Sequence, residues 1–397
     1  MEQVEDTLRV LYSTSDAQQR QTADAWLREF QASQAAWEIA VGLLTSGHTA
    51  DSKLFGATVL CTKLRGDNCG GLPPESAAIL RSVLLQHLGA MNADSEANLH
   101  AQLCRACSLL LGNGGVGSLV SDPAFASLGA AAMLAILALI PEAGAFLSDA
   151  ETVATQLLLL TWLQHAYVTG APFPPALPAS AAPTDCSDEY RLAVLEAACK
   201  WAEMPASDGI TLGRLAASPC SPELMRHADL RATPVARAQT SFYKEARLVF
   251  ELFRLVLDQE PSEEVAGVGS RLPSVPPSAL GELVASTMVA LEPLVVTADM
   301  AHTLPSGEED VDDDEEDESE EEAGVMLAAV GLGGALLSRA SAYLAPSTAA
   351  DEAGQRLSHA MLQLLQSIVP CSTHCKRAAP SGSAHWVVSG TVRRFLV

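Results

Sequence analysis

The sequence predicts an all-α protein, built as an α-solenoid (superhelix) of HEAT- or armadillo-like helical hairpins. Of its 397 residues, 48% are hydrophobic but only 5% are aromatic, and Ala and Leu dominate. This composition favours helix over sheet. Apolar residues also recur at helical spacing along most of the chain. Gly and Pro interrupt these stretches at short intervals, which predicts many short helices instead of a few long ones.

The first predicted helix begins after Asp16, whose side chain can cap its free N–H groups. Within it, Ala23, Trp26, Leu27 and Phe30 fall on one face. The further stripes with similar spacing are Trp37, Ala40, Val41 and Leu44 before Gly47; Leu54, Ala57, Cys61 and Leu64 before Gly66; Leu80, Leu84 and Leu88; Leu99, Leu103, Ala106 and Leu110; and Phe242, Ala246, Val249, Phe253 and Val256.

Such amphipathic helices cannot bury their apolar faces alone, but stacked pairs build one continuous core. HEAT and armadillo units run roughly 40 to 47 residues, so the chain has room for roughly nine of them. We expect helical repeats over residues 1–120, and more over 121–305 with Pro-rich loops at 172–183 and 273–277. We then expect an acidic disordered loop at 306–322, a further repeat at 323–370 and an atypical tail at 371–397.

The formal net charge is −24, and 13 of the 48 acidic residues lie between Glu308 and Glu322. A surface this negative repels phosphate backbones and anionic lipid heads, so we expect no direct nucleic-acid or membrane binding. The run, which includes Asp312, Asp313, Asp314, Glu315 and Glu316, could attract basic partners or could merely be a solubilising loop. Ser319 within it resembles an acidophilic kinase site.

Nine scattered cysteines predict a reducing, intracellular location. The first ten residues do not resemble a signal or transit peptide. The longest apolar stretches, Leu128–Ile140 and Ala323–Leu337, are shorter than the roughly 20 residues of a membrane span, so we expect none.

We find no motif that predicts catalysis or a cofactor, and the expectation is that the protein is not an enzyme. The glycine run 112–117 lacks the Lys and Ser/Thr of a phosphate-binding loop. Cys104 and Cys107 form a CxxC inside a predicted helix, which favours two core cysteines over a metal or redox pair. Cys371, His374 and Cys375 offer three metal ligands without an obvious fourth, and no metal is expected.

Residues Leu11–Leu44 resemble the opening helical hairpin of the importin-β superfamily of nuclear transport receptors. The similar pattern comprises Ala23, Trp26, Leu27, Phe30, Gln31, Ser33, Ala36 and Trp37. Of these, Trp26, Leu27, Phe30 and Trp37 are expected to hold the first hairpin together. The continuation resembles the transportin-SR and importin-thirteen branch at Leu72, Pro73, Ser76, Leu80, Arg81, Leu84 and Leu85. The resemblance covers about the first 110 residues, and because family members are much longer, we expect this chain to be an N-terminal portion.

The resemblance implies a receptor that shuttles between nucleus and cytoplasm. Its expected partners are the GTP form of Ran, basic or Arg/Ser-rich protein cargo, and nuclear pore proteins. The helices that hold Lys53–Leu64 and Leu99–Leu110 are the candidates for the GTPase face. The candidate partner contacts are Lys53 and Lys63, together with Asp312, Asp313, Asp314, Glu315 and Glu316 of the acidic run. A generic HEAT-repeat scaffold without Ran dependence, or an exportin of the same superfamily, remains an alternative reading.

Overall fold

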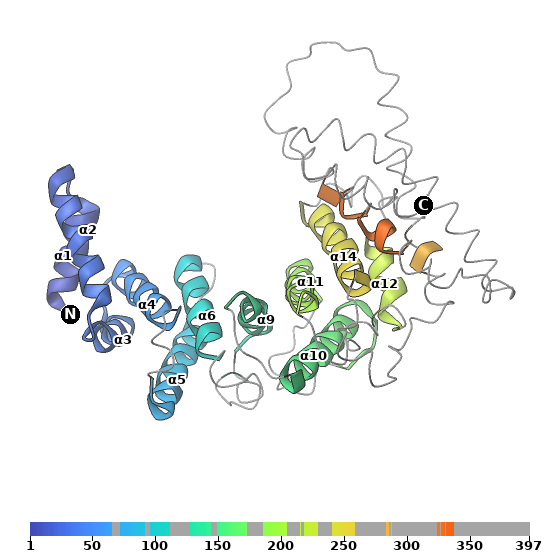
Figure 1. Ribbon diagram of the computed structural model, residues 1–397, viewed down its shortest axis with the longest axis horizontal. Coiled ribbons are helices and arrows are strands. Elements are labelled where there is room, and N and C mark those ends of the chain that lie inside the picture. The colour runs from blue at the N-terminus through green and yellow to red at the C-terminus, as the bar shows by residue number, and fades with distance from the viewer. Residues whose placement is uncertain are drawn as a thin grey trace, which may run out of the picture. The chain divides into compact units, whose positions relative to one another are not determined.

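The computed structural model describes residues 1–65, 72–91, 96–111, 125, 128–143, 149–172, 186–204, 215, 218–228, 240–258, 283–285, 287, 324–325, 327–329 and 331–336. All regular structure in these residues is helical, so the predicted all-α class is confirmed (Figure 1). Contacts divide the chain into two compact units, one built mainly on Met1–Glu151 and the other on residues from Thr152 onward.

The first unit contains consecutive helical pairs. These are α1 (Glu2–Ser13) with α2 (Ala17–Ala32), α3 (Ala36–Ser46) with α4 (Ala50–Arg65), and α5 (Pro74–Ala90) with α6 (Ala97–Leu111), followed by α9 (Ala130–Leu139) and the 3-10 turn η2 (Pro141–Ala143). Helix α4 also packs against α6, and α6 packs against α9. The second helices of the second and third pairs, α4 and α6, therefore lie side by side, as in a helical-repeat protein.

The pairing differs from the hairpin expected at Leu11–Leu44. That stretch contains α2 and α3, but these two helices touch only slightly, whereas α1 packs on α2 and α3 packs on α4. The expectation overlooked α1, although Val4, Leu8 and Leu11 follow the same helical spacing. Residues that carry the family resemblance thus belong to two consecutive pairs.

Local sequence explains where several helices begin and end. The Asp16 carboxylate accepts hydrogen bonds from the N–H groups of Gln18 and Gln19, at 2.8 and 3.4 Å, which confirms the predicted cap. Gly47 ends α3 as predicted, and a side chain would not fit there, because its Cβ would lie 2.2 Å from the carbonyl oxygen of Leu43. Pro74 begins α5 at a position where a missing N–H costs nothing.

Helices α3 and α4 approach each other closely at Gly56. A Cβ at this position would lie 2.8 Å from the carbonyl oxygen of Ala40 and 3.1 Å from the Cβ of Leu43. Ala40 and Leu43 are fully buried. A residue without a side chain therefore allows this pair to pack at short range.

The predicted apolar stripes form much of the core. Leu80, Leu84, Leu88, Leu99, Leu103, Ala106 and Leu110 are all buried in α5 and α6. In the third stripe Ala57, Cys61 and Leu64 are buried, while Leu54 is only half-buried. In the first two stripes Ala23, Leu27, Ala40 and Leu44 are buried, whereas Trp26, Phe30, Trp37 and Val41 are half-buried.

The second unit comprises α10 from Thr152 (full helix Asp149–Tyr167), α11 (Asp188–Ala202), α12 (Cys220–His227) and α14 (Thr240–Asp258). Both α11 and α12 pack against α14. The predicted stripe of α14 is buried throughout, at Phe242, Ala246, Val249, Phe253 and Val256. The side chains of Trp162 in α10 and Trp201 in α11 are also fully buried.

A helical segment within residues 324–336 lies alongside α14. A Cβ at Gly324 would be 3.5 Å from Cδ of Arg247, and one at Gly331 would be 2.9 Å from Cδ of Arg254. The two glycines and the two arginines are both seven residues apart, which is close to two helical turns. The glycines thus make room for the arginine stems.

Much of the predicted domain organisation lies outside the described residues. This applies to the border at 120, the loops at 173–183 and 273–277, the acidic loop at 306–322 and the tail at 371–397. Part of 323–370 is described and is helical. Within the described residues, no helix combines the length and the apolar character that crossing a bilayer requires.

Candidate partner-binding groove

An open groove of about 650 Å³ lies between α1 and α2. Helix α1 contributes Glu2, Gln3, Asp6, Thr7 and Val10 to its lining. Helix α2 contributes Gln18, Gln19, Thr22, Ala23 and Trp26. The lining thus combines carboxylates, amides and hydroxyls with an apolar side that includes an indole ring.

A small hydrophobic cluster holds the two walls of the groove together. Val4 and Leu8 of α1 pack with Leu27 of α2 and Leu43 of α3, and each is at most 3% exposed. Burying such side chains contributes about 1.5–3 kcal/mol each. The groove therefore lies on a packed base that fixes the separation of α1 and α2.

Trp26, one of the residues predicted to hold the first hairpin together, has a second role. Its ring stacks on Phe30 with centroids 5.8 Å apart and planes 8° apart, and Phe30 in turn stacks on Phe55. Leu27 is buried as predicted. Trp26 packs against the cluster while it also lines the groove, whereas Trp37 is half-buried and lies outside that cluster.

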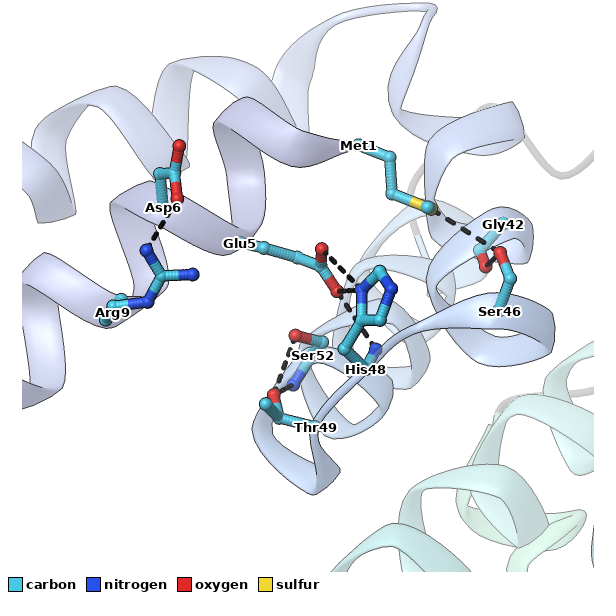
Figure 2. Close-up of polar contacts among 9 residues, drawn as sticks. All are labelled: Met1, Glu5, Asp6, Arg9, Gly42, Ser46, His48, Thr49 and Ser52. Atoms are coloured by element: carbon cyan, nitrogen blue, oxygen red, sulfur yellow. Dashed lines mark hydrogen bonds and ion pairs between the residues drawn. The ribbon is translucent and has the colours of Figure 1, made fainter.

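A polar clasp joins α1 to the turn between α3 and α4 (Figure 2). Glu5 accepts a hydrogen bond from the backbone N–H of His48 at 3.1 Å, and its carboxylate lies 3.0 Å from Nδ1 of the same residue. The backbone hydrogen bond is the main reason that the pKa of Glu5 is lowered, and the His48 ring and Ser52 add to it. These contacts attach α1, one wall of the groove, to the second helical pair, α3 with α4.

The structure gives Lys63 a structural role instead of the predicted partner contact. Its side chain is buried, and Nζ donates to the carbonyl oxygens of Ala32 and Ser33 at 3.2 and 2.8 Å. These carbonyls lie at the C-terminal end of α2, where helices leave acceptors unpaired. Because its ammonium group is bound within the fold, we remove Lys63 from the set of candidate contacts.

Lys53 is half-buried on α4 and makes no ion pair with another described residue. Together with burial, which is the larger effect, its charge lowers the pKa of His87 on α5. Burial raises the pKa of Cys61 to about 11, although the charges of Arg105 and Arg65 act to lower it, and the thiol donates to the carbonyl oxygen of Gln102 at 3.2 Å. The candidates Asp312, Asp313, Asp314, Glu315 and Glu316 lie outside the described residues.

The CxxC cysteines are core residues, as predicted. Cys104 and Cys107 are buried free thiols. Burial raises the pKa of Cys104 to about 12 and is also the main reason that the pKa of Cys107 lies well above its usual value. Within the described residues, no three His, Cys, Asp or Glu side chains are grouped to hold a metal ion. Cys371, His374 and Cys375 fall outside these residues.

A buried polar cluster in the second unit was not predicted from the sequence. It centres on Glu245 of α14, whose side chain is 5% exposed. Oε1 of Glu245 accepts hydrogen bonds from the Tyr167 hydroxyl at 2.7 Å and from Nε of Arg191 at 2.9 Å, and Nδ1 of His227 lies 3.8 Å away. One carboxylate thus links α10, α11, α12 and α14.

Burial and the neighbouring charges shift the pKa values of three groups in this cluster. Burial strongly raises the pKa of the Tyr167 hydroxyl, and the negative charge of Glu245 raises it further. Burial lowers the pKa of Arg191, but its hydrogen bond and ion pair with Glu245 outweigh this and raise it overall. Burial lowers the pKa of His227, which Glu245 offsets only in part. The cluster is therefore a charged Arg–Glu pair with a neutral tyrosine.

The consecutive helical pairs define a helical-repeat protein, with an open groove between α1 and α2. No family model matches the chain. A stretch of 112 residues is 33% identical to the uncharacterized protein C11G11.07 of Schizosaccharomyces pombe, and it covers 28% of this chain. The chain spans only 12% of that relative's length.

Among solved structures, the crystal structure of an engineered protein aligns with 100% of this chain and 98% of its own length, at 15% identity and a TM-score of 0.30. That likeness is too distant to carry any conclusion. The helical class therefore rests on the structure of the chain itself.

Proposed function

We propose that the chain is part of a nuclear transport receptor of the importin-β type. It would act as a binding protein and not as an enzyme. Its partners would be the GTP form of Ran, basic or Arg/Ser-rich protein cargo and nuclear pore proteins, and it would shuttle between nucleus and cytoplasm. The proposal begins from the resemblance over the first 110 residues, at Trp26, Leu27 and Phe30 above all.

The observation that carries the proposal is the contact between α4 and α6. These are the two helices proposed for the GTPase face, and they pack directly against each other within the first unit. A protein partner could therefore contact both at once. Lys53 and Arg105, both half-buried and free of ion pairs with described residues, offer charged contacts on these helices.

The test is capture of Ran by the full chain at near-physiological salt, with Ran loaded in parallel with GTP and GDP. We expect preferential capture of the GTP form. A Lys53→Glu/Arg105→Glu variant should capture less. The matched control is Arg9→Glu/Arg226→Glu, which makes the same charge change at exposed positions outside α4 and α6 and should behave as the unmodified chain.

Equal or absent capture of the two nucleotide forms by folded protein would contradict the proposal and favour a helical-repeat scaffold without Ran dependence. If Ran-GTP is captured, adding cargo separates the two directions of transport. An importin releases cargo when Ran-GTP binds, whereas an exportin takes up cargo with Ran-GTP.

A further inference from the structure

We propose that the groove between α1 and α2 binds an extended segment of a partner protein that carries two arginines in an Arg-x-Arg arrangement. The cargo in the transport proposal is also basic, so the inference adds a binding site to that proposal. It rests on the lining of the groove alone and holds whether or not the chain binds Ran.

The charge of the groove selects a cation. Glu2 and Asp6 are both exposed on the lining, and none of the ten lining residues carries a positive charge. Arg9 does pair with Asp6, but this pair is largely exposed and therefore weak. The N–H groups of Gln18 and Gln19, which could have attracted an anion at the start of α2, already donate to Asp16.

The spacing of the carboxylates selects alternate residues of an extended chain. Glu2 and Asp6 are four residues apart and so lie on one face of α1, separated by roughly 6 Å along its axis. In an extended peptide, side chains two residues apart point the same way and are separated by roughly 7 Å. An Arg-x-Arg segment therefore presents one guanidinium to each carboxylate, which two adjacent arginines cannot do.

Trp26 explains the choice of arginine over lysine. Its indole ring lines the groove beside Ala23, and its stack on Phe30 holds it in place. A guanidinium group stacks on an aromatic face and also binds carboxylates through two parallel hydrogen bonds, whereas an ammonium group does neither as well. The groove volume of about 650 Å³ lies within the range of known ligand pockets.

The test must report on the groove alone, because the acidic run between Glu308 and Glu322 would also attract basic peptides. We would incorporate fluorotryptophan into the full chain and follow its five tryptophans by fluorine NMR. The Trp26 resonance would be assigned with a Trp26→Phe variant. The probe is a capped GRGRG pentapeptide at roughly 0.1 M ionic strength, where charge interactions beyond about 10 Å are screened.

We expect saturable movement of the Trp26 resonance, with Trp37 as an unmoved reference on the next helix. The isomer GRRGG should bind about five-fold more weakly, and a peptide with citrulline in place of arginine should not move the resonance. A Glu2→Gln/Asp6→Asn variant should raise the dissociation constant at Trp26 by about five- to ten-fold.

Two further variants test whether the shift of the Trp26 resonance depends on the charge of the groove. Thr22→Arg places a positive charge in the groove at an exposed position and should abolish the shift of Trp26. Glu38→Gln/Asp51→Asn removes the same charge from exposed positions that do not line the groove, and should leave the dissociation constant within two-fold. An unmoved Trp26 resonance, equal binding of the two isomers, or an equal loss in this control would each overturn the proposal.

Discussion

Nζ of Lys63 donates a hydrogen bond to the carbonyl oxygen of Ser33, 2.8 Å away and 30 residues earlier in the chain. A second bond to Ala32 completes the cap on the end of α2. This buried lysine on α4 therefore ties the first helical pair to the second. It stabilises the fold and leaves the partner surface to other residues.

Replacing Lys63 with Met should destabilise the first unit. Two carbonyl groups lose their donor, and each lost hydrogen bond contributes about 0.5–1.5 kcal/mol, so we expect a loss of about 1–3 kcal/mol. Urea unfolding followed by circular dichroism measures it. Lys53→Met, which removes a lysine of the same helix without such bonds, should change stability by less than about 0.5 kcal/mol. Equal effects of the two substitutions would contradict the structural role.

Gly56→Ala should be destabilising even though alanine favours helix. Its Cβ would collide with the carbonyl oxygen of Ala40, so α3 and α4 would have to separate, at a cost of about 1–3 kcal/mol. Gly42→Ala in α3 is the matched control. There the Cβ would meet only Sδ of Met1 at 3.7 Å, and we expect a gain of about 0.5–1 kcal/mol. Thermal unfolding of both variants checks the difference in sign.

The clasp between Glu5 and His48 should make stability depend on pH. The folded-state pKa of Glu5 lies below its ordinary value of 4.5, so its contribution is present above about pH 4.5 and is lost as pH falls through the folded value. Glu5→Gln should therefore lose about 1 kcal/mol or less at pH 7, and less near pH 3, where protonation of the Glu5 carboxylate begins to remove its contribution. Urea midpoints measured at both values test this. A constant difference would show that the charge of Glu5 is irrelevant.

Arg191→Met should be among the most damaging single substitutions in the second unit. It leaves the buried Glu245 carboxylate without its cation, which costs about 3–5 kcal/mol. Arg226→Met breaks an ion pair that is 71% exposed on the arginine side and should cost less than about 0.5 kcal/mol. Chemical unfolding of both variants gives the comparison. Comparable losses would mean that the buried position of Glu245 is unimportant.

The CxxC thiols should be unreactive in the folded protein. Burial raises the pKa of Cys104 to about 12, so almost no thiolate forms near neutral pH, and Cys107 is buried as well. Among the cysteines that the structure describes, iodoacetamide labelling with peptide mapping should modify the half-buried Cys186 first and both CxxC cysteines only after unfolding. Rapid labelling of Cys104 in native protein would contradict its place in the core.

Much of the fold could be predicted because its signals are local. The spacing of Phe242, Ala246, Val249 and Phe253 identified the buried face of α14, and Asp16 and Gly47 marked helix ends. Each signal lies within a few residues of the feature that it specifies. The groove was missed because α1 was not recognised as the partner of α2, although the spacing of its apolar residues could have revealed it.

The sequence by itself determined the helical class, several caps and the core cysteines, because these depend on composition and on neighbours one or two turns away. Only the tertiary structure decided which helices pair, that Lys63 is a buried cap, and that Glu245 meets Tyr167 across 78 residues of chain. Contacts of this kind leave no periodic trace in the sequence. They depend on how whole helices pack. A charged residue gives the same sequence pattern whether packing buries it or leaves it exposed.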